Sequence, residues 1–405
     1  MTRNLSLFRA IGAILPLTVL AACSLVGGPF GAHKAAPPAV VAAPPPPPAL
    51  PAPEETSRFE LADGQNVIGA LQETTVGKDD TLTDIARRFN LGYEELLRAN
   101  PGVDPWLPGV GRTIVLPTRF VLPDAPHDGV VINIAAMRLF YFPPHKAGEP
   151  QVVFTHPIGI GKVGWATPEG TTKIVRRQKD PTWHPPISVI KEHKENGDVL
   201  PAVVGPGPDN PLGNRAFYLT WPGYLIHGTN KPAGVGLRSS HGCIRLFPED
   251  ISELFEKVPI GTEVHVVNQP YVFGWDSGQL VMQAFGSLED DRRDWKKAQQ
   301  ALMSRSLSKN VQQELKTRGQ TVDWDLVTQL AHEPRGLIVP VTLTDASLDK
   351  VLASATKVEN QLPDGASWDG KSDLPMDEQT FNQMMGESDP QDHAVPAPAA
   401  HKSGG

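Results

Sequence analysis

The chain has 405 residues, of which 40% are hydrophobic and 20% are charged, and its formal net charge is −8. This composition is typical of a globular protein of roughly two to three domains, and the negative charge argues against a nucleic-acid partner, which would favour a basic face. Proline is unusually frequent, with 41 residues whose densest runs lie near the ends. We therefore expect folded domains in the middle of the chain and extended segments at its ends.

The first 23 residues predict export. Arg3 and Arg9 precede the apolar run "AIGAILPLTVLAAC", which is too short and wrongly flanked for a stable membrane span. The four residues that end at Cys23 resemble a bacterial lipobox, which implies that 1–23 is a lipoprotein signal peptide and that Cys23 carries lipid. The resemblance also implies the outer membrane, because lipoproteins with Ser rather than Asp after the cysteine, as at Ser24, tend to be sorted there. The alternative is an ordinary cleaved signal with an incidental cysteine.

The number of cysteines indicates that Cys243 has a chemical rather than a structural role. Cys23 and Cys243 are the two cysteines of the sequence. If Cys23 is lipidated, Cys243 has no disulfide partner in an oxidising compartment, where an unpaired thiol is a liability unless it reacts. The alternative, a Cys23–Cys243 disulfide, would tie a flexible terminus to a motif 220 residues away. We therefore treat Cys243 as a candidate reactive group.

Residues 24–57 are rich in proline and predict an extended, semi-rigid linker with a reach on the order of 100 Å. Residues 74–117 then predict a small β-α-α-β unit. Thr81 and Asp84 form a T-x-x-D helix start, a second short helix covers 93–99, and "RTIVLP" is a closing strand. The first helix places one apolar face inward, formed by Leu82, Ile85, Ala86 and Phe89.

The motifs "DDTLTDIARRF" and "ANP" of this unit resemble the LysM module. The resemblance implies binding of glycan strands that contain N-acetylglucosamine. The usual Gly-Asp before Thr-Leu is Asp79-Asp80 here. The alternative is a small packing unit without a ligand.

Residues 120–270 predict mainly strands, in "DGVVINIAAMRLFYF", "EPQVVFTHPIGIG" and "TEVHVVNQP", and many short strands broken by Gly and Pro suggest a sheet-on-sheet or barrel core. Residues 271–345 predict a partly helical extension that packs on this strand-rich domain, covers a cleft in it or binds a partner. Its expected elements are a helix from Ser287 with Leu288, Trp295, Ala298 and Leu302 on one face, helices around Val311–Leu315 and Trp324–Ala331, and a short strand in "GLIVPVTL". Residues 358–405 predict a disordered tail.

Two short motifs carry the chemistry. His227 lies in "YLIHGTN", and "SSHGCIR" follows with His241, Gly242, Cys243 and Arg245. A thiolate beside an imidazole is a nucleophile for acyl transfer, and amides of the Gly242–Cys243 turn could stabilise an oxyanion. The guanidinium of Arg245 is a fork-shaped hydrogen-bond donor that is suited to holding a carboxylate.

Two other interpretations of these motifs remain. A zinc site formed by His227, His241 and Cys243 is the rival, but a single residue separates the last two, whereas structural zinc ligands usually lie two to four residues apart. We expect neither metal nor cofactor. Each histidine alone could also be a core residue, although both flank an unpaired cysteine in glycine-rich turns.

"IHGT" followed by "SSHGCIRL" resembles the signature of the YkuD family of L,D-transpeptidases. The segments "PIGIGK", "TPEGTTKI", "PTWHPP" and "NPLGNRAFYL" resemble its ErfK/YbiS type in Gram-negative envelopes, so that the likeness covers roughly residues 60–345. It implies a mixed α+β, mainly β fold. In that fold, 120–270 is a β-sandwich-like catalytic domain behind the LysM-like module, followed by a mostly helical extension.

The resemblance also implies the residue roles. Cys243 attacks the carbonyl before the terminal D-alanine of a peptidoglycan tetrapeptide stem, at diaminopimelate. His227 is the base, oriented by the carbonyl of Gly228. The amides of residues 241–243 form the oxyanion hole, with His241 and Ser240 in the pocket. Arg245 steadies the donor or the cysteine loop.

The ErfK/YbiS resemblance favours a lysine amine of an outer-membrane protein as the acyl acceptor, reached by a periplasmic enzyme on a lipid anchor. Alternatives are a second stem peptide, which gives 3–3 cross-links, or water, which gives hydrolysis. A protein of another class, a non-catalytic wall-binding tether, would not need the Cys243–His227 pair.

Overall fold

The computed structural model of the protein describes residues 50–371, except residues 63, 147, 196, 198, 294–308 and 343–344. The lipoprotein signal with Cys23, the linker up to residue 49, and residues 372–405 of the predicted tail lie outside the described residues. Within the described ranges, no helix is both long and apolar enough to cross a membrane.

The predicted β-α-α-β unit is present. It consists of β3 (Gln72–Thr75), α1 (Leu82–Arg88), α2 (Tyr93–Ala99) and β4 (Thr113–Leu116). Thr81 caps α1 as the sequence predicts: its hydroxyl accepts from the Asp84 amide, and the Asp84 carboxylate accepts from the Thr81 amide. Strands β3 and β4 pair antiparallel. The apolar faces of α1 and α2 are buried in a cluster that also contains residues of β4 and of the strand-rich region 129–157.

The catalytic region is built on a nine-stranded sheet with the order β1-β8-β7-β6-β15-β10-β11-β12-β14. Most neighbours are antiparallel, but β15 pairs with β6, and β12 with β14, in parallel. The strands are β1 (Arg58–Leu61), β6 (Gly129–Asn133), β7 (Arg138–Phe142), β8 (Gln151–Pro157), β10 (Gly170–Lys179), β11 (Arg215–Leu219), β12 (Leu225–His227), β14 (Ile244–Arg245) and β15 (Glu263–Val267).

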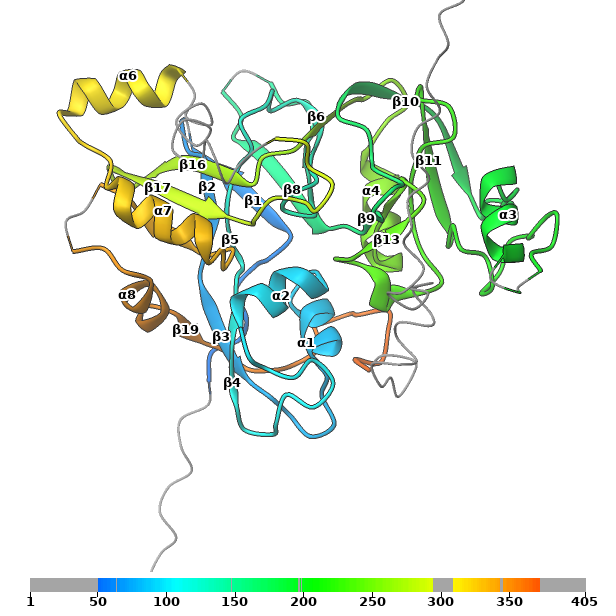
Figure 1. The fold of residues 1–405 in the computed structure, drawn as a ribbon, viewed down its shortest axis with the longest axis horizontal. Helices are drawn as coiled ribbons and strands as arrows, with labels where there is room; N and C mark the ends of the chain where they lie inside the picture. Colours follow the sequence, from blue (N-terminus) through cyan, green and yellow to red (C-terminus); the bar gives the residue numbers. More distant parts are fainter. Residues whose placement is uncertain are drawn as a thin grey trace, which may run out of the picture. The chain divides into compact units, whose positions relative to one another are not determined.

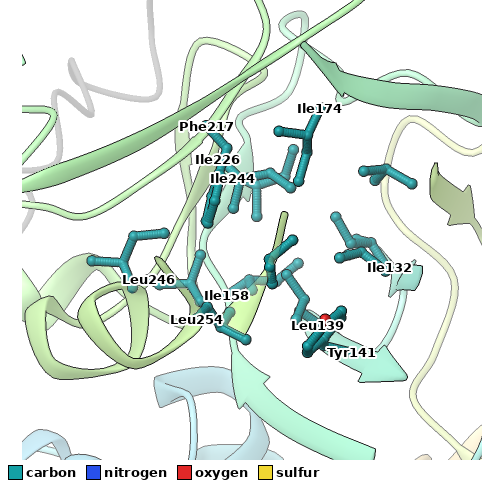
Figure 2. Packing of buried hydrophobic residues seen from close by; sticks show 14 of the residues in the cluster. Ile132, Leu139, Tyr141, Ile158, Ile174, Phe217, Ile226, Ile244, Leu246 and Leu254 are labelled. Atoms are coloured by element: carbon teal, nitrogen blue, oxygen red, sulfur yellow. The ribbon is translucent and has the colours of Figure 1, made fainter. Parts of the chain in front are cut away.

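Both halves of this sheet bury side chains in one core. Ile132 and Leu139 from β6 and β7 share a cluster with Phe217, Ile226 and Ile244 from β11, β12 and β14 (Figure 2). Helix α4 (Pro248–Lys257) closes the cluster with its apolar face. The mainly β, sheet-on-sheet packing that the sequence predicts is therefore observed.

Several shorter elements accompany this sheet. Strands β9 (Ile160–Gly161) and β13 (Arg238–Ser240) pair in parallel, and the 3-10 helix η1 (Pro232–Gly234) lies in the segment between β12 and β13. Helix α3 (Ile187–Glu195) belongs to the segment between β10 and β11 and lies beside these strands (Figure 1). Strands β2 (Val67–Gly69) and β5 (Arg119–Val121) form a separate pair.

The extension contains a sheet that the sequence analysis did not predict. Strands β16 (Tyr271–Asp276) and β17 (Gln279–Ala284) form a hairpin, and β18 (Ile338–Pro340) joins it as the third strand. Helix α7 (Trp324–His332) covers this sheet (Figure 1). The strand predicted in "GLIVPVTL" is confirmed as β18. The helices predicted around Val311–Leu315 and Trp324–Ala331 are confirmed as α6 (Lys309–Arg318) and α7, and a further helix, α8 (Leu348–Ala353), follows.

The helix expected from Ser287 does not begin there. Residues 285–293 are irregular, because tertiary contacts outweigh helix propensity: Leu288 packs on the catalytic core and Asp290 accepts two hydrogen bonds from the Arg238 guanidinium. Trp295, Ala298 and Leu302, the rest of that expected helix, lie outside the described residues.

Two expectations about extended segments need correction. The predicted tail begins too early, because β19 (Thr356–Lys357) pairs in parallel with β3 and Val358 is buried beside it. After β19, the side-chain amide of Asn360 donates hydrogen bonds to the Thr75 carbonyl and to the Asp80 carboxylate of the LysM-like unit. The end of the predicted linker is also held: the Ser57 carbonyl accepts from the Thr155 amide on β8.

The β-α-α-β unit packs closely on the catalytic region. Arg138 of β7 forms a buried ion pair with Glu95 of α2, at 2.7 Å between Nε and Oε1. At the start of α2, the amide of Tyr93 donates to the Val235 carbonyl, and Gly92 approaches Gly236 so closely that a Cβ on Gly92 would lie 2.7 Å from the Gly236 Cα. The unit is thus fixed against the segment that joins the two catalytic motifs.

Candidate active site

The cysteine lies in a tight turn between β13 and β14. Ser240 spans this turn, since its hydroxyl donates to the Cys243 carbonyl at 2.6 Å and accepts from the Gly242 amide at 3.1 Å. Gly242 has φ +98°, and a Cβ there would lie 2.8 Å from a ring carbon of Tyr224. Thr167 donates to the Gly242 carbonyl at 3.0 Å. The sequence "SSHGC" is therefore a turn that requires glycine at position 242.

The parallel pairing of β12 and β14 brings the two predicted catalytic residues to one face of the sheet. Ile226 pairs with Ile244 and both point into the core, whereas His227 pairs with Arg245. Because side chains alternate along a strand, His227, Arg245 and the preceding Cys243 project from the opposite face. Motifs 14 residues apart in the sequence thus converge on one site.

His227 is held as a neutral imidazole with a defined tautomer. It is 3% exposed, and its Nδ1 donates to the Gly228 carbonyl at 2.6 Å. Burial, together with the positive charge of Arg245, lowers the pKa of His227 to about 3, although the Gly228 contact opposes the shift. Since a carbonyl only accepts, the proton sits on Nδ1 and Nε2 keeps its lone pair. His227 can therefore accept a proton at neutral pH.

Cys243 is a free, partly exposed thiol. Its Sγ donates to the Gly223 carbonyl at 3.6 Å. Burial raises the pKa of this thiol, while the Leu225 backbone and the Arg245 charge act in the opposite direction. The resting site thus holds a thiol rather than a thiolate, and a base is needed to generate the nucleophile.

Arg245 lies beneath the turn as a cation without an acidic side chain to pair with among the described residues. Its Nη1 donates to the hydroxyl and the carbonyl of Ser239, at 3.2 and 3.4 Å, and its Nε has no partner there. Burial lowers the pKa of its guanidinium. The group can stabilise a thiolate or receive an anionic part of a ligand.

The turn offers fewer oxyanion donors than expected. The Gly242 amide is already used by the Ser240 hydroxyl, whereas the Cys243 amide donates to no acceptor in the described part of the chain. Gly228 contributes the carbonyl that orients His227, and a Cβ at this position would lie 3.0 Å from a side-chain carbon of Ile251 on α4.

His241 is embedded in a set of side chains that the sequence analysis did not connect with the site. Its Nε2 lies 2.5 Å from Oε2 of Glu192 on α3, and Lys162 pairs with the other oxygen of that carboxylate. The Trp165 ring lies edge-on to the imidazole, with centroids 4.7 Å apart. The Lys162 amide donates to the Ser240 carbonyl at 2.9 Å, so the turn that carries Lys162 lies against the cysteine loop.

Charges around His241 act in opposite directions. The pKa of His241 is lowered overall: burial is the largest cause, the contact with Glu192 opposes the shift, and the charges of Lys162 and Arg245 add to it. For Glu192, burial opposes ionisation, but the contacts with Lys162 and His241 lower its pKa overall. The sequence does not reveal this cluster by motif spacing, because Glu192 lies 49 residues before His241 in a polar helix. Of its members outside the cysteine motif, Lys162 stood in a segment that the sequence analysis had quoted, "PIGIGK".

No group of three or more His, Cys, Asp or Glu side chains is arranged to hold a metal ion within the described ranges. His227 uses Nδ1 for a carbonyl and His241 uses Nε2 for a carboxylate. These contacts suit proton transfer, and the donor set offers no complete coordination shell.

The chain shows clear similarity to known families and proteins. The YkuD L,D-transpeptidase catalytic domain matches residues 127–266, and the LysM domain matches residues 74–117. A probable L,D-transpeptidase YbiS of Escherichia coli K12 is 44% identical over 211 residues, which cover 51% of this chain and 67% of that protein.

Two further relatives agree. A probable L,D-transpeptidase YcfS of Escherichia coli K12 is 43% identical over 227 residues, 55% of this chain and 69% of the relative. The putative L,D-transpeptidase YkuD of Bacillus subtilis 168 is 32% identical over 194 residues, 47% of this chain and 96% of the relative. The chain therefore belongs to the YkuD family of L,D-transpeptidases, with a LysM domain in front of its catalytic domain.

Proposed function

We propose that this protein is a peptidoglycan L,D-transpeptidase with Cys243 as its nucleophile. In the first half-reaction, His227 Nε2 takes the thiol proton and Sγ attacks the carbonyl before the terminal D-alanine of a tetrapeptide stem. The C–S bond forms, the C–N bond breaks, and His227 returns the proton to the leaving amine. An amine acceptor then resolves the thioester.

The observation that carries this proposal is the pairing of β12 with β14. It supports a thiol and a neutral imidazole on one face, with the tautomer of His227 fixed by Gly228. A thiol with a raised pKa needs such a base, and Arg245 offers a positive charge to the developing thiolate. A non-catalytic tether has no need for this arrangement.

The free Cys243 amide is the donor that we assign to the oxyanion, together with the His241 amide. The Gly242 amide is omitted because Ser240 occupies it. The function of Ser240 and Gly242 is then to shape the turn, and Arg245 holds either the thiolate or a carboxylate of the donor stem.

The finer assignments follow from the sequence. Diaminopimelate is the proposed donor residue, and the LysM domain is proposed to bind the glycan strand. The acceptor is a lysine amine of an outer-membrane protein, and Cys23 anchors the enzyme to the outer membrane from the periplasmic side. The lipobox-like ending at Cys23 and the proline-rich linker support this location.

The nucleophile is tested by replacing it. Cys243→Ala abolishes the covalent adduct with a carbapenem and the release of D-alanine from a tetrapeptide stem, because no thiol remains to attack. Intact-mass measurement reads the adduct, and an unchanged thermal unfolding midpoint shows that the variant folds. Adduct formation in this variant would overturn the assignment.

The acceptor is tested in cells. Walls from a deletion strain are digested, and the muropeptides are resolved by mass. Loss of protein-linked stems supports the lysine acceptor, whereas loss of 3–3 dimers alone transfers that role to a second stem.

A further inference from the structure

We propose that His241 and Glu192 form a carboxylate–imidazole pair that removes a proton from the acceptor amine in the second half-reaction, while His227 serves the thiol in the first. This inference rests on the proposed function. It assigns a catalytic role to His241 and positioning roles to Glu192 and Lys162.

The two half-reactions present different proton donors to a base, a neutral thiol in the first and a cationic ammonium in the second. A lysine-type ammonium has a pKa of about 10.4, so its deprotonation requires an imidazole whose protonated form is stabilised. His227 is unsuited to a cationic donor, since it is buried beside the positive charge of Arg245, and both disfavour a second cation there. Glu192 faces His241 directly, at 2.5 Å, and favours the imidazolium that forms there.

Access also separates the two histidines. His227 is 3% exposed, whereas the His241 side chain is 22% exposed and its partner Glu192 is 26% exposed. An acceptor amine therefore reaches the His241 side of Cys243 more readily. Because Nε2 donates to Glu192, Nδ1 of neutral His241 is left with a lone pair for the incoming ammonium.

Lys162 and Trp165 limit the movement of this pair. Lys162 holds the second oxygen of the Glu192 carboxylate, and its backbone is bonded to Ser240 in the cysteine turn. Trp165 lies edge-on to the imidazole. The charged groups that face His241 are thus Glu192 from α3, Lys162 from the turn after β9, and Arg245 from β14.

The transfer step balances as follows. His241 takes one proton from the ammonium, and the amine nitrogen attacks the thioester carbonyl. The C–N bond forms and the C–S bond breaks. The second nitrogen proton passes through His227 to the departing sulfur, and His241 releases its proton to solvent. The products are an amide, the free thiol and one proton.

The test separates the two half-reactions in the full chain. A tetrapeptide stem is the donor and Nα-acetyl-lysine amide is the acceptor. Single-turnover release of D-alanine reports acylation, and mass-resolved conjugate reports transfer. Glu192→Gln lowers the ratio of transfer rate to acylation rate by about 10- to 100-fold, because the imidazolium loses its carboxylate partner. Glu195→Gln, on the same helix and 64% exposed, leaves both rates unchanged.

The pH profile supplies a readout that structural damage does not imitate. Glu192 raises the pKa of His241 and Lys162 lowers it. Glu192→Gln therefore moves the acid limb of the transfer rate to lower pH, and Lys162→Met moves it to higher pH. Shifts of opposite sign support the pair; equal loss of both rates, or acid limbs that do not move, overturns it.

If Glu192→Gln fails to fold, as judged by its unfolding midpoint, the sign of the Lys162→Met shift decides alone. The two proposals also fail separately. A wild-type chain that releases no D-alanine contradicts the proposed function, whereas D-alanine release with an unchanged rate ratio contradicts the pair alone.

Discussion

Two imidazoles flank Cys243, and they are held by different kinds of structure. His227 ends a strand of the core sheet, and a backbone carbonyl fixes it. His241 lies in a turn, and its partners are the side chains of α3 and of the segment after β9. The first depends on main-chain geometry that the fold determines, while the second depends on charges that a single substitution can remove.

This difference has a chemical meaning. A histidine buried without a counter-ion stays neutral over a wide pH range, whereas a carboxylate beside a histidine stabilises the protonated form relative to such a site. The site thus contains one imidazole suited to a neutral thiol and another suited to a cationic amine.

The largest effect is expected from removing the inner imidazole. His227→Ala slows acylation by about 10²- to 10⁴-fold, the usual contribution of a general base. His241→Ala slows the same step by less than about ten-fold, because its role lies in transfer. Single-turnover D-alanine release measures both variants, and a reversed order of the two effects would contradict the assignment of bases.

A change in the turn between His241 and Cys243 should have an intermediate effect. Gly242→Ala slows acylation about ten-fold and lowers the free energy of unfolding by about 1–2 kcal/mol, since a Cβ at φ +98° is strained and contacts Tyr224. Gly164→Ala is the matched control: Gly164 also has a positive φ, +82°, but nothing lies within 4 Å of its Cβ position. Chemical denaturation compares their stability, and equal acylation rates would show that the contact with Tyr224 does not matter.

The smallest effect is a pH response that stays nearly flat. The folded-state pKa of His227 is lowered to about 3, so the imidazole remains neutral from pH 7 to pH 5, and acylation changes less than about two-fold. For a histidine with an ordinary pKa of about 6.5, the fraction in the neutral form would fall roughly 25-fold over the same range. Acylation rates measured across this range decide between the two, and a fall beyond ten-fold would contradict the buried base.

The sequence predicted those parts of the site that depend on local pattern. The T-x-x-D start of α1 and the helix at 93–99 need contacts within a few residues, and both are confirmed. The Cys243 and His227 motifs lie close in the chain, and the prediction that they meet agrees with the pairing of β12 and β14. Their catalytic roles stay predictions.

Contacts between distant segments were beyond that reasoning. Glu192 reaches His241 from a polar helix, and nothing in its spacing distinguishes it from its exposed neighbour Glu195. The hairpin at 271–284 did leave a signal, because Asp276-Ser277-Gly278 separates two apolar runs, and Ser277 and Gly278 both have positive φ.

The pairing of β19 with β3 affects the order in which the chain can fold. The Thr74 hydroxyl donates to the Val358 carbonyl, 284 residues later, so the sheet of the LysM domain gains its last strand from the far end of the described chain. Ribosomes synthesise the N-terminal side first. The domain that emerges first is therefore the last to be completed, and its edge strand stays open for pairing during most of synthesis.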